Sequence, residues 1–217
     1  MCGICGWIGF DRDLRGPDTR QLLADMTDSM RNRGPDDEGS WVDGHAALGH
    51  RRLAIIDLQG GRQPMTLRAG DRPAFVLVYS GETYNYRELR ERLVSAGHRF
   101  ETGSDTEVVL HAHSEWGRDD PRAAVNELNG MFAYALWNVA SRELLLVRDR
   151  LGIKPLYYYP TKQGVLFGSE PKAILANPLA TGLSMPTGFV VYSAPLPIHT
   201  AQFFATCARF LRVTLCE

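Results

Sequence analysis

The sequence predicts an α+β fold in which antiparallel sheets are stacked and covered by helices on both sides. Three observations predict it. Short apolar segments follow one another in pairs, as strands of hairpins do. Segments with apolar residues at helical spacing are interleaved with these pairs. The chain has 217 residues, which is enough for one large domain with a sizeable core.

The first elements are a strand and a helix. Residues 3–10 are short, apolar and rich in glycine, so they favour a buried strand, and Cys2 lies at its end. From about residue 18, apolar side chains recur at helical spacing until a polar segment begins at Arg31. This pattern predicts a helix over 18–31.

A sheet-building region and two helices are expected next. Strands are predicted at 39–42, 46–49, 53–57 and 74–79, because short apolar segments alternate there with turns that contain glycine or proline. Two helices are predicted over 86–96 and over 105–116, each followed by a glycine. Ser104 and Glu107 form a capping-box pattern at the start of the second helix.

The C-terminal part adds further strands. They are predicted at 131–137, 143–148, 156–159 and 164–167. Residues 179–217 are apolar, carry few charges and repeat no earlier pattern. We therefore expect a domain over 2–178 and an atypical tail over 179–217, either a truncated end or a segment unrelated to the domain.

The charge balance argues against several classes of partner. Lys and Arg total 24 and Asp and Glu total 25, so no excess of one sign would attract nucleic acid or an anionic membrane. No apolar segment reaches the ~18 residues of a membrane span, and no secretory signal pattern precedes the first strand. The four cysteines do not form an evenly spaced framework, which favours a reducing setting. We expect a cytoplasmic protein.

Cys2 has the position of an N-terminal nucleophile. A methionine before a small residue is usually removed, which would leave Cys2 with a free thiol and a free α-amine. An α-amine titrates near ~8 and can act as the base for the thiol. The alternative is a redox or metal pair with Cys5. The strand-like segment after Cys5 and the lack of a second closely spaced cysteine pair count against it, but position alone leaves both interpretations open.

Several ordered segments resemble class II glutamine amidotransferases, nearest to the glutaminase half of asparagine synthetases. They are MCGICG at the start, RGPDDEG (33–39), GHRRLAIIDL (49–58), GSDTEVVLH (103–111), LNGMFAYALW (128–137), RDRLGIKPLYYY (148–159) and GSEPKAIL (168–175). The resemblance covers about residues 1–178. It implies an N-terminal nucleophile hydrolase with a four-layer αββα sandwich, and an enzyme that releases ammonia from glutamine through a Cys2 γ-glutamyl thioester.

The resemblance also implies the site. Cys2 would be the nucleophile, and no metal is expected. Gly81, and more weakly Ser80, would stabilise the oxyanion. The substrate-binding set would be Arg52 for the carboxylate, Glu82 and Asp105 for the ammonium, and the backbone of Leu53, Ala54, Ile55 and Ile56 along the pocket.

For two further residues in these motifs, a structural role is an alternative to a functional role. Arg33 would either orient the nucleophile's loop or stabilise a turn. His50 is expected to be a packed or hydrogen-bonded histidine rather than the base, because the amine has that role in the family.

The sequence departs from its family in two places. The oxyanion motif is usually Asn-Gly-Glu, whereas this chain has Ser80-Gly81-Glu82, and a serine hydroxyl reaches less far than an asparagine amide. The phosphate-binding Ser-Gly-Gly-x-Asp-Ser segment of the synthetase half does not occur. We therefore expect no cofactor in this chain, and ATP and Mg²⁺ only with a separate synthetase domain or subunit.

Glutamine is the expected substrate, and the synthetase domain or subunit would receive the ammonia; a homodimer is a further candidate assembly. The alternative to an active glutaminase is a weak or inactive module that binds glutamine or docks on a synthetase.

Overall fold

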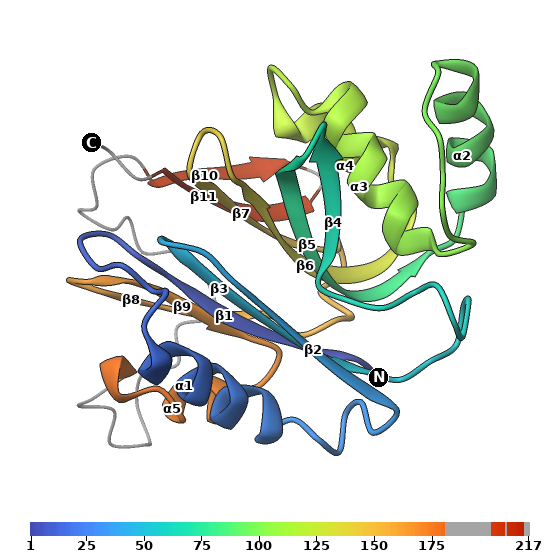
Figure 1. Cartoon of the computed structure of the whole chain (residues 1–217). Coiled ribbons are helices and arrows are strands. Elements are labelled where there is room, and N and C mark those ends of the chain that lie inside the picture. The colour runs from blue at the N-terminus through green and yellow to red at the C-terminus, as the bar shows by residue number, and fades with distance from the viewer. Residues whose placement is uncertain (181–200, 207, 215–217) are drawn as a thin grey trace.

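The computed structural model describes residues 1–180, 201–206 and 208–214 (Figure 1). Two antiparallel sheets lie face to face. The first has the strand order β2-β3-β1-β9-β8, and the second has the order β10-β11-β7-β6-β5-β4. The strands of the first sheet are β1 (Gly3–Gly9), β2 (Asp37–Val42), β3 (Ala46–Arg52), β8 (Tyr157–Thr161) and β9 (Gly164–Gly168). Those of the second are β4 (Met65–Ala69), β5 (Arg72–Thr83), β6 (Gly130–Asn138), β7 (Glu143–Arg148), β10 (Ala201–Thr206) and β11 (Ala208–Thr214).

Helices cover the outer face of each sheet. The helices against the first sheet are α1 (Pro17–Asp28), α5 (Pro171–Leu175) and the 3₁₀ turn Pro178–Ala180. Those against the second are α2 (Tyr86–Ser95), α3 (Asp105–Trp116) and α4 (Pro121–Glu127). The predicted stacking of helix, sheet, sheet and helix is confirmed. None of the helices in the described ranges is long and apolar enough to span a membrane.

Three apolar clusters separate the four layers, and strand alternation divides the side chains among them. In β1, Ile4 and Ile8 face the second sheet, whereas Cys5 and Trp7 pack under α1. In β5, Val76 and Val78 face the first sheet and Leu77 and Tyr79 pack under α2 and α3. The even-numbered positions of both strands therefore point into the space between the sheets.

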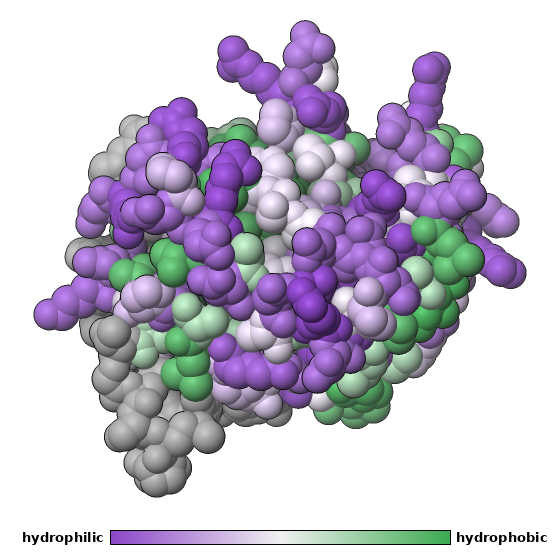
Figure 2. All heavy atoms as spheres, turned by 60° about the horizontal axis from the view of Figure 1, so that its bottom comes forward, coloured by the Kyte–Doolittle hydropathy of each residue, from purple (hydrophilic) through white to green (hydrophobic). Residues whose placement is uncertain are grey.

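The surface over α1 and α5 is mostly hydrophilic, with apolar atoms in separate patches (Figure 2). Helix α1 buries Leu23 and Met26 and exposes Asp18, Arg20 and Asp25. This one-sided burial matches the helical spacing of its apolar residues.

One predicted strand is wrong. Residues 53–57 form a loop, in which Asp57 adopts a left-handed conformation with φ 48°. The backbone carbonyls of this loop accept hydrogen bonds from Arg52 instead of a neighbouring strand. Strand β4 and helices α4 and α5 were not predicted from the sequence.

The C-terminal segment contributes backbone pairing to the second sheet. Strand β11 pairs with β7 from Arg209 opposite Arg148 to Thr214 opposite Glu143, and β10 pairs with β11. Residues 181–200, 207 and 215–217 lie outside the described residues. The expected division into 2–178 and 179–217 stays a prediction.

Candidate active site

A cavity opens where the ends of β1, β3 and β5 meet between the two sheets. The empty space in it is about 620 Å³, part of which is open to solvent. The residues that line it are Met1, Cys2, Arg52, Leu53, Ile55, Ile56, Gly61, Gln63, Tyr79, Ser80, Gly81, Glu82, Ser104, Asp105, Thr106, Met131 and Lys154. Of the predicted site residues, only Ala54 is not part of this lining.

The alternation of side chains along the strands explains why these residues face the same cavity. Cys2 lies just before β1 on the side of Ile4, and Arg52 ends β3 on the side of Leu48. Ser80 and Glu82 continue the face of Val78 along β5. These side chains therefore enter the same space from two different sheets.

The main chain of Cys2 is held from two sides. Its carbonyl accepts hydrogen bonds from Arg33 Nε at 3.0 Å and from Ser80 Oγ at 2.9 Å. The amine of Met1 donates to the carbonyl of Arg33 at 3.0 Å. The backbone N–H of Leu53 points at Cys2 Sγ, with a separation of 3.3 Å between the two heavy atoms. The thiol is thus fixed at the cavity wall.

Cys5 lies in a different environment from Cys2. It is fully buried beneath α1, where its thiol contacts Thr27 Oγ1 at 3.5 Å. Burial raises the pKa of the Cys5 thiol to about 12. Within the described part of the chain, no group of three or more His, Cys, Asp or Glu residues could hold a metal ion. Cys5 therefore has the environment of a core residue.

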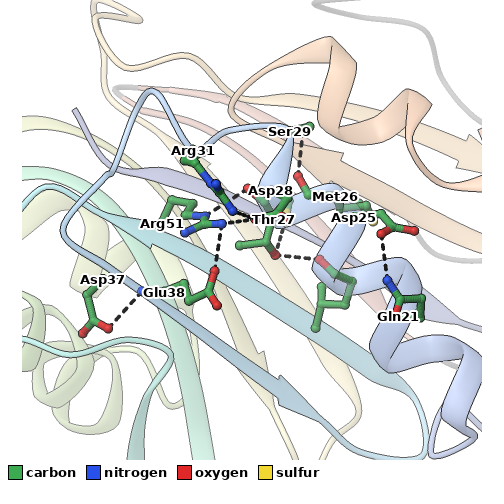
Figure 3. Close-up of polar contacts among 12 residues, drawn as sticks. Gln21, Asp25, Met26, Thr27, Asp28, Ser29, Arg31, Asp37, Glu38 and Arg51 are labelled. Carbon is green, nitrogen blue, oxygen red and sulfur yellow. Dashed lines mark hydrogen bonds and ion pairs between the residues drawn. The ribbon is translucent and has the colours of Figure 1, made fainter.

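Adjacent arginines at the end of β3 point in opposite directions. Arg51 faces α1, where it donates to Asp28 and pairs with Glu38 at 2.8 Å (Figure 3). Arg52 faces the cavity and donates to the carbonyl of Leu58 at 2.9 Å and to that of Asp57. The loop of residues 53–61 therefore wraps around the Arg52 guanidinium.

Two carboxylates fix this loop from outside the cavity. Asp36 accepts a hydrogen bond from the N–H of Ala54 at 2.8 Å, which accounts for the position of Ala54 away from the cavity. Asp57 accepts from Gly60 at 2.8 Å and from Gly103 at 2.7 Å, and these bonds lower the pKa of the Asp57 carboxyl. The bond to Gly103 connects the Arg52 loop to the segment that precedes Asp105.

Asp105 begins α3 with its carboxylate at the cavity. Its Oδ2 accepts from the N–H of Thr83 at 2.9 Å, and burial raises the pKa of the Asp105 carboxyl. Ser104 caps the helix by accepting from Thr106 N–H at 3.1 Å, as predicted. Glu107 does not complete the predicted capping box, because its carboxylate accepts from the backbone N–H groups of Glu101 and Thr102.

The N–H of Gly81 is directed toward the cavity side of β5. The N–H of Tyr79 donates to Gln63 Oε1 at 2.6 Å and that of Thr83 donates to Asp105, both on the side away from β6. N–H groups two residues apart on a strand point the same way, so the N–H of Gly81 lies between them on this side. Such a backbone donor suits a developing oxyanion.

His50 connects the two sheets next to the cavity. Its Nε2 lies 3.1 Å from the carbonyl of Tyr79, and because a carbonyl only accepts, the ring nitrogen is the donor. Burial lowers the pKa of His50 to about 4, so the ring is neutral at pH 7. The expectation of a hydrogen-bonded histidine agrees with this geometry.

Sequence reasoning missed several residues of the lining, above all Lys154. This side chain is buried, and its Nζ lies 3.3 Å from Met1 Sδ. Asp149 shapes the turn before it by accepting from the N–H groups of Leu151, Ile153 and Lys154. The RDRLGIKPLYYY segment was the available signal, but nothing in its spacing indicates that it turns toward the N-terminus.

The family described as "Glutamine amidotransferase domain" matches this chain over residues 1–210. The chain belongs to the glutamine amidotransferase domain family. The chain is 46% identical over 179 residues to "Asparagine synthetase [glutamine-hydrolyzing] 3" of Bacillus subtilis, which covers 82% of this chain and 28% of the relative. It is 36% identical over 157 residues to "Asparagine synthetase [glutamine-hydrolyzing] 1" of Arabidopsis thaliana, covering 72% and 25%.

A solved amidotransferase shares the fold. It is the glutamine phosphoribosylpyrophosphate amidotransferase from B. subtilis complexed with ADP and GMP, with a TM-score of 0.67 and 22% identity. The similarity covers 81% of this chain and 43% of that chain. The predicted four-layer sandwich of N-terminal nucleophile type is thus confirmed, and this glutamine amidotransferase domain is of the asparagine synthetase type.

Proposed function

We propose that this glutamine amidotransferase domain hydrolyses the side-chain amide of glutamine at Cys2 and delivers the ammonia to a synthetase domain or subunit. One observation carries the proposal. A thiol, a guanidinium and two carboxylates, those of Cys2, Arg52, Glu82 and Asp105, line the same cavity. Glutamine has a carboxylate, an ammonium group and an amide, so each of its polar groups has a partner of matching chemistry.

The binding roles follow from charge. Arg52 receives the substrate carboxylate, and its guanidinium is already oriented by the carbonyls of Asp57 and Leu58. Glu82 and Asp105, which line the same cavity, receive the ammonium group. The backbone of Leu53, with Ile55 and Ile56, forms the wall along the substrate's aliphatic chain.

Acylation begins after Met1 is removed. The α-amine of Cys2 takes the thiol proton, and the sulfur attacks the amide carbon of glutamine. The electron pair of the C=O bond moves to oxygen, and the oxyanion accepts a hydrogen bond from the N–H of Gly81. When the intermediate collapses, the C–N bond breaks, the α-ammonium returns its proton to the leaving nitrogen, and ammonia departs.

Deacylation repeats the sequence with water. The α-amine takes a proton from water as the water oxygen attacks the γ-glutamyl thioester. Collapse of the second intermediate breaks the C–S bond, and the proton passes to the thiolate. Glutamate leaves and the Cys2 thiol is restored.

The asparagine-synthetase-type relatives support an ammonia acceptor. This chain matches about 28% of the length of the first of them. We place the acceptor activity in a separate synthetase domain or subunit. We assign ATP and Mg²⁺ to that domain or subunit. The chemistry of the cavity described above needs only this chain's residues.

Purified protein whose N-terminus has been confirmed as Cys2 by mass spectrometry tests the proposal. We expect continuous formation of glutamate and ammonia in equal amounts. Calorimetry with glutamine gives the second measurement. Binding of glutamine without turnover would contradict the proposed hydrolysis and support a glutamine-binding module.

A further inference from the structure

Ser80 replaces the residue that the family uses as an oxyanion donor, and its hydroxyl is directed elsewhere. A hydroxyl has one proton to donate. Ser80 Oγ lies 2.9 Å from the carbonyl oxygen of Cys2, which can only accept, so the proton points at the Cys2 main chain. Only 1% of Ser80 is exposed, so water does not compete for this bond. In this geometry the proton is not available to an oxyanion.

This hydrogen bond joins the two sheets at the reaction centre. Cys2 lies just before β1 of the first sheet, whereas Ser80 belongs to β5 of the second. A second hydrogen bond joins the two sheets at the residue before Ser80, from His50 Nε2 to the carbonyl of Tyr79 at 3.1 Å. The two hydrogen bonds fix β5 against β1, which follows Cys2, and against β3, which carries Arg52.

The position of β5 determines where the oxyanion donor lies. The N–H of Gly81 directly follows Ser80 in the chain and points to the cavity side. A shift of β5 relative to Cys2 would therefore change the distance from the thiol to this donor. Misplacements of about 1 Å cost as much as ~10²-fold in rate in enzymes.

We propose that Ser80 is a positioning residue, which holds the carbonyl of Cys2 so that the thiol faces the N–H of Gly81, rather than an oxyanion donor itself. The proposal rests on the proposed glutaminase function. Loss of a positioning residue is expected to lower kcat less than loss of an oxyanion donor, because removing such a donor costs about 10²–10³-fold in kcat.

Two readouts on the processed chain test this role. One is kcat and KM for glutamine hydrolysis, and the other is the rate at which iodoacetamide alkylates Cys2, followed by peptide mass spectrometry. Alkylation forms no oxyanion, so an oxyanion donor does not affect it, whereas a group that orients Cys2 does. The alkylation assay also works if the wild-type chain hydrolyses no glutamine, which separates failure of this proposal from failure of the proposed function.

Ser80→Ala is expected to lower kcat about tenfold, with KM within twofold, and to slow Cys2 alkylation severalfold. Ser80→Thr keeps the hydroxyl and is expected to retain both values within threefold. The matched control is Ser169→Ala, since Ser169 is equally buried and its Oγ accepts from the N–H of Ile4 in β1 at 3.0 Å, but it does not line the cavity. Its kcat and alkylation rate are expected within twofold of wild type.

Three results would overturn the proposal. A fall in kcat of ~10²-fold or more in Ser80→Ala with unchanged alkylation would identify an oxyanion donor. Unchanged kcat and alkylation in Ser80→Ala would remove Ser80 from the reaction. Equal losses in Ser169→Ala would mean that general weakening of β1, rather than the bond to Cys2, explains the effect.

Discussion

The hydroxyl of Ser80 donates to the main-chain carbonyl of Cys2 at 2.9 Å and so connects the second sheet to the residue that precedes β1, the central strand of the first sheet. Around this contact, the side chains that would hold the α-carboxylate and the α-ammonium group of glutamine approach from different elements. Arg52 comes from β3 and Asp105 from α3.

An N-terminal extension should abolish glutamine hydrolysis. Retained Met1, or a tag before Cys2, converts the α-amine into an amide, which has no basic lone pair. Met1 also lines the cavity, with its Sδ 3.3 Å from Lys154 Nζ. We expect less than a hundredth of the activity, an unchanged circular dichroism spectrum, and recovery after proteolytic removal of the extension. Full activity of the extended protein would exclude the amine as base.

Arg52→Lys should raise KM for glutamine by about tenfold or more, because lysine offers a point charge in place of a planar fork. It also loses the contacts to Asp57 and Leu58 that shape the pocket loop. Steady-state kinetics measure the effect.

The neighbouring residue provides the control for Arg52. Arg51→Lys should leave KM within twofold, since Arg51 faces away from the cavity toward Asp28 and Glu38 (Figure 3). It should lower the free energy of unfolding by ~1–2 kcal/mol. Equal effects on KM in both variants would show that the loop, rather than the charge at position 52, determines glutamine affinity.

Glutamine binding should weaken on acidification because of Asp105. Burial raises the pKa of this carboxyl above its usual 3.8, so it becomes protonated at a higher pH than an exposed aspartate. The neutral form no longer attracts the substrate ammonium, and KM should rise as pH falls through this raised pKa. Asp105→Asn should have a KM about tenfold higher at pH 7 and lack this rise. If Asp105→Asn kept the wild-type pH dependence of KM, Asp105 would not be the titrating group.

Glu107 should contribute to stability in a pH-dependent way. Burial raises the pKa of this carboxyl, but the His111 ring, whose Nε2 lies 3.8 Å from Oε1, and hydrogen bonds from Glu101 and Thr102 outweigh it and lower the pKa from 4.5 to about 2. A depressed carboxyl pKa stabilises the fold above the unfolded value, and the contribution is lost as pH falls from 4.5 to about 2. Glu107→Gln should lower the free energy of unfolding by about 2–3 kcal/mol at pH 7.

Urea unfolding at pH 7 and at pH 3 measures the effect of Glu107→Gln. The difference from wild type should shrink at the lower pH. Glu115→Gln is the control, since Glu115 is a half-buried glutamate on the same helix whose carboxylate lies 2.9 Å from Nε2 of His98. A difference in stability that does not depend on pH would mean that packing, not the charge of Glu107, is responsible.

Alternation and helical spacing were sufficient to predict the layers, because each element buries one face. They placed β1, α1, α2 and α3 close to their observed bounds. The segment 53–57 failed because its apolar residues resemble a strand, whereas Arg52 binds its carbonyls and Asp57 turns it in a left-handed conformation. The pattern of apolar residues does not show whether a side chain or a neighbouring strand binds the backbone carbonyls of a segment.

The site was predictable only in part, and for a physical reason. The resemblance supplied Cys2, Arg52 and Asp105, which the structure brings to one cavity. It could not indicate that the Ser80 hydroxyl turns toward the Cys2 carbonyl, because that choice depends on the separation of two sheets. Lys154 was missed because it reaches the cavity through a turn that Asp149 stabilises, and the sequence pattern does not show where that turn points.

The central claim is that Cys2 is the nucleophile of a glutaminase. The most direct test is glutamate release by the processed wild-type chain and by Cys2→Ala, which keeps the α-amine and removes only the thiol. We predict many turnovers for wild type and no release by Cys2→Ala, with equal melting temperatures for both. Glutamate release by Cys2→Ala at the wild-type rate would contradict the account.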